Sequence, residues 1–116
     1  MKSIEVKSFS NADEVVDVHN NAYIQAVSVG GQRIVKLTLQ PGWKWSVDVK
    51  PNVGTDTCQA AHLGIINKGT ICCIHDDGTE ATYTAGDAYS IEPGHDAWVV
   101  GDEVAEAIEF AGVWGE

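Results

Sequence analysis

The segment from Asp56 to His62 brings three metal-binding residue types together within seven positions. It reads Asp-Thr-Cys-Gln-Ala-Ala-His, and Gly69 follows after six further residues. Carboxylate, thiolate and imidazole groups all bind divalent metals, and thiolate together with imidazole favours zinc, with iron or copper as alternatives. We therefore take Asp56, Cys58 and His62 as candidate metal ligands. His62 also suits acid–base catalysis, because its imidazole can be neutral at pH 7.

A second segment, from Gly86 to Gly94, precedes another histidine. It reads Gly-Asp-Ala-Tyr-Ser-Ile-Glu-Pro-Gly and is followed directly by His95. The Pro-Gly pair predicts a turn. His95 is therefore either an exposed residue of that turn or a further ligand and acid–base group.

The two segments resemble the two signature motifs of the cupin superfamily. The first motif is H-x-H-x(3 or 4)-E-x6-G, and its ligand positions hold the Asp, Cys and His of the first segment. The second motif, G-D-x3-[apolar]-P-x-G-x2-H-x3-N, places its histidine at Ala97, two residues after His95 and on the same face of an extended strand. The resemblance covers residues 41–101 and implies a metal site rebuilt from Cys58, His62 and His95. It also implies a double-stranded β-helix, or jelly-roll barrel, with a pocket at the barrel mouth.

The elements that would position these residues are predicted to be short strands separated by turns. Apolar residues alternate with polar ones or form short β-branched runs bounded by Gly, Pro or Asp. The expected strands cover residues 4–9, 22–29, 33–39, 43–49, 61–67, 70–75, 80–84, 88–91, 97–100 and 105–110. This pattern predicts an all-β fold in one domain, residues 1–116. The motif-bearing core would be residues 33–110, with N-terminal strands and a polar segment in residues 1–32.

Glycine-containing turns mark the expected hairpins. Gly30-Gly31 and Asp77-Gly78 are strong signals, because glycine tolerates the positive φ that tight hairpins require. Lys68-Gly69 is expected to join the strands on either side of it into another hairpin. Residues 51–54 are expected to form a loop, and residues 10–21 to hold one helical turn at most.

Aromatic residues offer a second kind of site. Trp43 and Trp45 would share one face of an extended strand, and Trp98 follows the turn that precedes His95. These side chains either pack in the core or an interface, or form an aromatic wall around a small organic ligand. Tyr89 would add a hydroxyl group to such a pocket.

Charge and length exclude several functions. The 116 residues include 17 acidic and 7 basic ones, a net charge of -10, which argues against a nucleic-acid partner. No apolar run reaches the roughly 18–20 residues that span a bilayer. The N-terminus lacks the apolar stretch of a signal peptide, and three cysteines leave one unpaired, so we expect a reduced, cytoplasmic protein. His19 and His75 lie in polar surroundings and are expected to be exposed.

Three functions remain open from the sequence. In the first, the protein is an enzyme whose divalent metal, held by Cys58, His62 and His95, activates water or dioxygen or polarises a carbonyl group. In the second, a metal-free barrel binds a small organic molecule and reports its presence. In the third, His62 or His95 is an acid–base catalyst without a metal. Metal binding together with a small-molecule ligand is the favoured interpretation.

A homodimer is also expected. The strand over residues 61–67 carries apolar residues on both faces, more than a half-solvated sheet needs. A second subunit or the N-terminal strands would cover the outer face, and the sheet edges would need cover as well.

Overall fold

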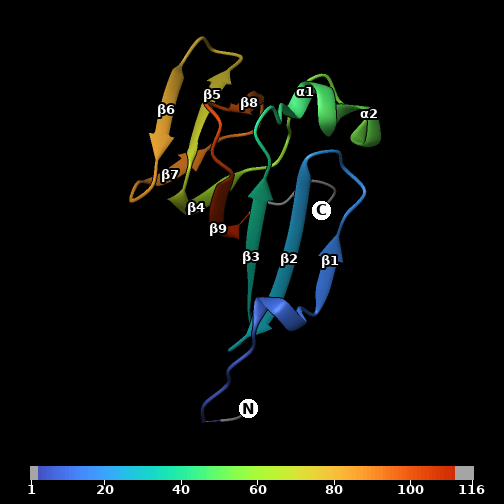
Figure 1. Ribbon diagram of the computed structural model, residues 1–116, viewed down its shortest axis with the longest axis vertical. Helices are drawn as coiled ribbons and strands as arrows, with labels where there is room; N and C mark the ends of the chain where they lie inside the picture. The colour runs from blue at the N-terminus through green and yellow to red at the C-terminus, as the bar shows by residue number, and fades with distance from the viewer. Residues whose placement is uncertain (1–2, 112–116) are drawn as a thin grey trace.

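Two antiparallel β-sheets make up the computed structural model of this chain, which describes residues 3–111 (Figure 1). The strands are β1 (Glu14–Val16), β2 (Ala22–Val29), β3 (Gln32–Leu39), β4 (His62–Lys68), β5 (Thr70–His75), β6 (Glu80–Thr84), β7 (Ala88–Ile91), β8 (His95–Val99) and β9 (Ala105–Ala111). The helical segments are η1 (Phe9–Asn11), α1 (Trp45–Asp48) and α2 (Lys50–Val53). The all-β fold class expected from the sequence is confirmed.

The strands are divided unequally between the sheets. The six-stranded sheet has the order β1-β2-β3-β9-β4-β7, and the three-stranded sheet has the order β6-β5-β8. Consecutive strands from β4 to β9 lie in different sheets except for the pair β5 and β6, so the chain crosses repeatedly between the layers. β2 and β3 extend beyond the smaller sheet (Figure 1). Inward-facing side chains of both sheets form one buried apolar cluster that includes Trp43 and Trp45.

Two hairpins match the sequence prediction. β2 and β3 are joined by Gly30-Gly31, whose φ values are 59° and 78°. A two-residue hairpin needs this positive φ, which glycine adopts without steric cost. β5 and β6 are joined by the turn that contains Asp77-Gly78. On β3, Val35, Leu37 and Leu39 are buried, as a period of two predicts.

The connection between β4 and β5 is not the expected hairpin. β4 pairs with β7 and β9, whereas β5 pairs with β6 and β8. Gly69 has a φ of 76°, and a Cβ there would lie 2.6 Å from the carbonyl oxygen of Val104 and 2.7 Å from Cα of Ala105. Only glycine fits so close a backbone approach. The prediction was wrong because this glycine forms a corner at which the chain changes sheets.

Residues 43–49 do not form the predicted strand. Their aromatic and β-branched content favours a strand locally, but two carboxylates stabilise the start of α1 instead. The backbone N–H of Lys44 donates to Asp48 over 2.9 Å, and that of Ser46 donates to Asp96 over 3.1 Å. Carboxylates that accept from first-turn amides stabilise a helix start. The helix therefore depends on a contact with β8 that the local sequence cannot reveal.

Two other segments also differ from the predictions. Residues 51–54 were expected to be a loop, but most of them belong to α2, whose first turn contains Pro51. Residues 4–9 form no strand, and Ile4 and Val6 are 81% and 85% exposed. β1, which pairs with β2, lies within the segment expected to be polar and irregular.

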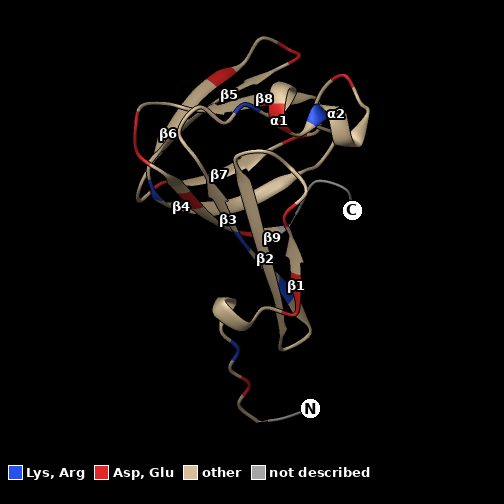
Figure 2. Cartoon of the chain, turned by 45° about the vertical axis from the view of Figure 1, so that its right-hand side comes forward, with Lys and Arg blue, Asp and Glu red and all other residues tan. Residues whose placement is uncertain are grey.

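Acidic residues dominate the charge of the surface. The β5–β6 hairpin carries acidic residues and no basic ones between residues 70 and 84 (Figure 2). Within residues 3–111, no helix has the length and apolar character that crossing a membrane requires.

Candidate metal centre

Cys58, His62 and His95 lie together in the interior. Cys58 precedes β4, while His62 and His95 are the first residues of β4 and β8. Their exposed fractions are 1%, 5% and 3%, and one possible ligand atom from each lies within 4.8 Å of the other two. Zinc bond lengths of about 2.0–2.3 Å place neighbouring atoms of a tetrahedral site about 3.3–3.8 Å apart. The cluster therefore needs the ligand atoms to approach one another by about 1.5 Å at most to hold such an ion.

Main-chain hydrogen bonds join Cys58 to the start of β8. The N–H of Cys58 donates to the carbonyl oxygen of His95 over 2.8 Å, and the N–H of Gly94 donates to that of Cys58 over 2.7 Å. Gly94 has a φ of 100°, and a Cβ there would lie 3.0 Å from Oδ2 of Asp76. This turn places His95 in the interior. His95 is therefore not the exposed turn residue that the sequence left as one of its two alternatives.

The ring of His95 leaves Nε2 available to the cluster. Its Nδ1 lies 2.8 Å from the carbonyl oxygen of Glu92. A carbonyl oxygen can only accept, so Nδ1 carries the hydrogen and Nε2 of the neutral ring keeps its lone pair. The rings of His62 and His95 lie edge to face with their centroids 5.1 Å apart.

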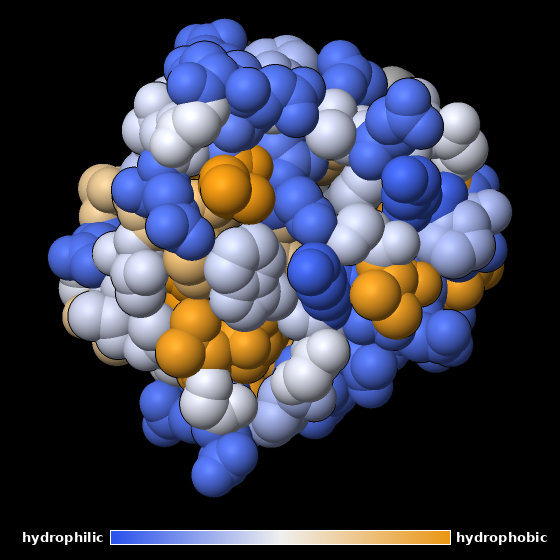
Figure 3. Space-filling model, turned by 90° about the horizontal axis from the view of Figure 1, so that it is seen from above, coloured by the Kyte–Doolittle hydropathy of each residue, from blue (hydrophilic) through white to orange (hydrophobic). Residues whose placement is uncertain are grey.

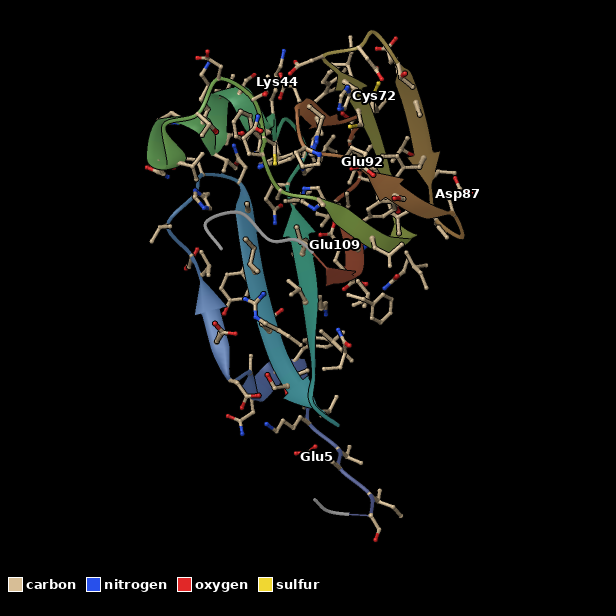
Figure 4. The ribbon with its side chains drawn as sticks, turned by 180° about the vertical axis from the view of Figure 1, so that it is seen from behind. Glu5, Lys44, Cys72, Asp87, Glu92 and Glu109 are labelled. Carbon is tan, nitrogen blue, oxygen red and sulfur yellow. The ribbon has the colours of Figure 1, made fainter. Side chains whose placement is uncertain are left out.

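Glu109 of β9 orients His62 in the same way. Nδ1 of His62 lies 2.7 Å from Oε1 of Glu109, and the hydroxyl of Tyr89 donates to Oε2 over 2.6 Å. Nε2 of His62 lies 3.6 Å from Sγ of Cys58. Glu109 lies in the interior, where β9 runs beside β3 and β4 (Figure 4). A carboxylate on the remote nitrogen of a ligand histidine fixes its ring and raises its basicity.

The sequence analysis did not identify Glu109. Residues Ala105, Ala107 and Glu109 alternate with more exposed neighbours along β9, and Glu109 is only 4% exposed. A carboxylate is rarely buried unless it has a partner. An acidic residue on the inward face of an otherwise apolar strand was therefore the available signal.

Gly64 leaves space for this carboxylate. It lies on the inward face of β4 beside His62, as the alternation in the sequence predicts. A Cβ on Gly64 would lie 2.8 Å from Cγ of Glu109, 3.0 Å from the hydroxyl oxygen of Tyr89 and 2.5 Å from the carbonyl oxygen of Ile108. The small residue is thus required by the position of Glu109.

The hydrogen bonds in the cluster change the acidity of its members. Burial of Cys58 would by itself raise the pKa of the thiol, but hydrogen bonds with His62 and His95 lower that pKa to about 7. Burial would also lower the pKa of His62, but hydrogen bonds with Cys58 and Glu109 raise it to about 9. Between about pH 7 and pH 9, Cys58 as a thiolate beside His62 as an imidazolium is therefore the favoured state of the pair.

A small cavity adjoins the cluster. Its volume of about 30 Å³ has room for one or two water-sized groups, and His62, His95, Trp43, Trp45 and Tyr89 form part of its wall. Trp45 is 1% exposed, and its Nε1 makes no hydrogen bond to any residue in the described part of the chain. A buried N–H without an acceptor is unfavourable. Trp45, which lines the cavity, thus has a buried N–H without an acceptor among the described residues.

Two predicted site residues are not at this centre. Asp56 is exposed in the loop that precedes Cys58. Trp98 lies on the opposite face of β8 from His95, because residues three apart on a strand point in opposite directions. The Trp98 ring lies beside Lys44 instead, with Nζ 5.3 Å from the ring centroid.

Other aromatic residues are placed differently from the expectation. Trp43 and Trp45 line the cavity, but they do so from the start of α1 and the segment before it rather than from a shared strand. His19 is 8% exposed and makes a hydrogen bond with Asn52, so its predicted exposure was wrong. The side chain of His75 is 26% exposed.

Comparison with known proteins rests on the fold, because neither a protein-family profile nor a curated protein sequence matches this chain. An RmlC-like cupin from Shewanella frigidimarina is similar with a TM-score of 0.59 and 18% identity, over 99% of this chain and 97% of that one. This protein has the cupin fold. The polyketide cyclase RemF from Streptomyces resistomycificus is similar with a TM-score of 0.63 and 12% identity, over 94% of this chain and 79% of that one. An oxalate decarboxylase from Lactobacillus farciminis has a TM-score of 0.61 and 14% identity, over 100% of this chain and 36% of its own.

The donor set of this cupin-fold protein fits a metal ion. Cys58 offers a thiol of lowered pKa, and His62 and His95 each have Nδ1 engaged with an oxygen acceptor. Their Nε2 atoms are then the nitrogens left for a metal, which is the usual arrangement of ligand histidines. One sulfur and two nitrogen donors suit zinc and leave a fourth position open.

Proposed function

We propose that the protein holds a divalent metal, preferably zinc, at Cys58, His62 and His95 and acts with it on a small organic molecule. The convergence of one thiol and two oriented imidazoles within 4.8 Å, all buried, carries this proposal. A metal with three protein ligands keeps a position at which water is activated or a carbonyl group is polarised.

The surrounding residues would orient the substrate and exclude water. Trp45 would donate its Nε1–H to an oxygen atom of the substrate, because that N–H faces no acceptor among the described residues. Glu109 would keep Nε2 of His62 directed at the metal position through the 2.7 Å hydrogen bond to Nδ1. The cavity of about 30 Å³ admits a single functional group such as a carbonyl, so the rest of the substrate would lie outside it.

Elemental analysis of untagged protein tests the metal proposal. We expect about one zinc per chain after expression with zinc supplied, and a large loss in Cys58→Ser because an alcohol is a poor zinc ligand. Cys72→Ser is the matched control, since Cys72 is also buried but lies outside the cluster. Protein without metal after zinc supplementation, or equal zinc in both variants, would reject the proposal.

The hydrogen-bonded series Cys58, His62 and Glu109 favours a second function. Sγ of Cys58 lies 3.6 Å from Nε2 of His62, whose Nδ1 is held by the Glu109 carboxylate. A nucleophile, a base and an orienting carboxylate in this order support acyl transfer without a metal. The thiolate of Cys58 would add to an acyl carbon, and imidazolium His62 would return a proton to the leaving group.

Metal-stripped protein separates the two functions. The thiolate mechanism predicts a burst of about one equivalent of p-nitrophenol from p-nitrophenyl acetate, which Cys58→Ser abolishes and added zinc suppresses. A burst of the same size in Cys58→Ser, or its absence from metal-free wild type, would reject nucleophilic catalysis.

A further inference from the structure

A second cavity lies outside the metal centre, between the edges of the two sheets. Its volume is about 280 Å³, near the lower end of the range for small-molecule sites. β6 and β7 are the terminal strands of their sheets and lie close together in Figure 1. We call the space between them, which Tyr83, Tyr89, Ile91, Asp77 and Glu92 help to line, the edge cleft.

The edge cleft shares a wall with the inner cavity. Tyr83, Tyr89 and Ile91 line both spaces, and the rings of Tyr83 and Tyr89 lie 4.6 Å apart between centroids at 31°. The hydroxyl of Tyr89 donates to Glu109, which holds His62. A molecule seated in the cleft would therefore touch the same tyrosine that supports the metal centre.

Carboxylates are the main charged groups of the edge cleft. Asp77 and Glu92 supply them, and among residues 3–111 no lysine or arginine lines the cleft. His75 lies beside Asp77: its Nε2 is 2.8 Å from the carbonyl oxygen of Pro93, and its Nδ1 accepts from the N–H of Asp77 over 3.1 Å and lies 3.3 Å from Oδ1 of the same residue. The carboxylate of Glu92 is therefore the acidic group of the cleft that has no such neighbour among the described ion pairs. Burial raises the pKa of the Cys73 thiol to about 12, so this group is uncharged.

Four basic side chains have partners elsewhere in the molecule. Lys7, Arg33 and Lys36 form ion pairs on the six-stranded sheet and the N-terminal segment. Lys44 lies over Trp98, on the outer side of β8. An anionic ligand would thus meet repulsion from the carboxylates of the cleft, and no lysine or arginine among residues 3–111 lines the cleft to offset it.

Apolar and aromatic side chains also line the edge cleft. The aromatic rings of Tyr83 and Tyr89, together with Ile91 and Ala81, lie beside the carboxylates. At this end of the molecule, hydrophobic residues form separate patches among hydrophilic ones (Figure 3). A ligand that fits both features has an apolar or aromatic body and a positively charged group, which carboxylates and aromatic rings both attract.

We propose that the edge cleft binds a small organic amine with an aromatic or apolar body and holds it against Tyr89, whose hydroxyl donates to the Glu109 carboxylate that orients His62 of the metal centre. The link to the metal centre rests on the proposed function, because the centre supplies the chemistry. Recognition of an amine rests on the residues of the cleft alone. The same charges disfavour carboxylate ligands such as a small dicarboxylate.

Three probes of equal size test the recognition: benzylamine, benzyl alcohol and benzoate. We expect benzylamine to bind at least about fivefold more tightly than benzoate at low salt, with the alcohol between them, and the preference to shrink as salt is added. In ¹⁵N-labelled protein, the amide shifts should concentrate at residues 79–83 and 89–92. Equal binding of the three probes, no binding of any, or shifts elsewhere would overturn the proposal.

Variants assign the preference to the cleft. Glu92→Gln should weaken benzylamine binding by about threefold to fivefold, and Glu103→Gln, which removes the same charge from an exposed residue outside the cleft, should not change it. Cys58→Ser should keep the amine preference, since it lacks only a metal ligand. Amine selectivity in wild-type protein that binds no zinc would reject the metal centre and support the edge cleft as an amine site. Zinc binding without amine selectivity would support the metal centre and reject the amine site.

Discussion

Glu109 and His62 lie 47 residues apart in sequence, and a hydrogen bond of 2.7 Å joins them in the interior. The bond connects β9 to the first residue of β4 and occupies the histidine nitrogen that faces away from Cys58. In the first cupin motif, which the sequence resembles, a glutamate stands where this chain has His62. Here the buried carboxylate lies on a neighbouring strand and holds the ring of that histidine.

Replacing Glu109 tests this supporting role. We expect Glu109→Gln to lower zinc affinity by about 10–100-fold, because the ring of His62 loses a charged partner that orients it and raises its basicity. Competition with a chromophoric chelator measures the change. Glu106→Gln, on the outer side of the same strand, should leave the affinity within about twofold; an equal loss in both variants would contradict the role.

The acidity of Cys58 gives a pH-dependent prediction. A pKa lowered to about 7 means that the thiolate persists to lower pH than in ordinary cysteine. Thiolate absorbance near 240 nm in metal-free protein should rise with a midpoint near pH 7. His62→Ala should move the midpoint upward, because the hydrogen bond that stabilises the thiolate is lost.

Cys58→Ser is the control for this titration and should abolish the transition near pH 7. Cys73, whose pKa is raised to about 12 by burial, stays protonated over the same range. A wild-type midpoint at the ordinary value for cysteine would show that His62 does not stabilise the thiolate.

Gly64 should not tolerate a side chain. In Gly64→Ala the added Cβ meets Glu109, Tyr89 and the backbone of Ile108 at 2.5–3.0 Å. Overpacking of this kind destabilises a core by about 1–3 kcal/mol, and displacement of Glu109 should also weaken zinc binding. Thermal unfolding and zinc titration measure the two effects; Asn67→Ala, an exposed position on the same strand, should change neither much.

The homodimer expected from the sequence would use the outer face of the six-stranded sheet. Leu63, Ile65 and Phe110 lie on that face and are 53%, 44% and 39% exposed. Light scattering at micromolar concentration should give twice the mass of the chain, and Ile65→Glu should give a monomer. A specific interface would bury roughly 1,200 Å² or more in total, and wild type at monomer mass would refute the dimer.

The sequence predicted those parts of the fold that depend on local periodicity and turn chemistry. The alternation along β4 places His62 and Gly64 inward, and the motif spacing brings Cys58, His62 and His95 near one another. The first follows from the period of two in strands, whereas the second was implied by the resemblance to the two cupin motifs.

The features that the sequence did not predict depend on contacts between distant segments. α1 starts where it does because Asp96 accepts a hydrogen bond from Ser46, fifty residues earlier. Gly69 is a corner rather than a hairpin because its chain neighbours pair with other strands. Glu109 could not be assigned to His62 without the strand order, since β9 lies between β3 and β4.

The bridge between Cys58 and His95 consists of main-chain atoms alone. It places the side chains of residues 58 and 95 next to each other whatever their types, because no side-chain atom takes part in it. Cys58→His would convert the donor set to three imidazoles on an unchanged backbone and shift its preference among metals. A backbone of this kind can therefore accept a different side chain at either position without a change in its own hydrogen bonds.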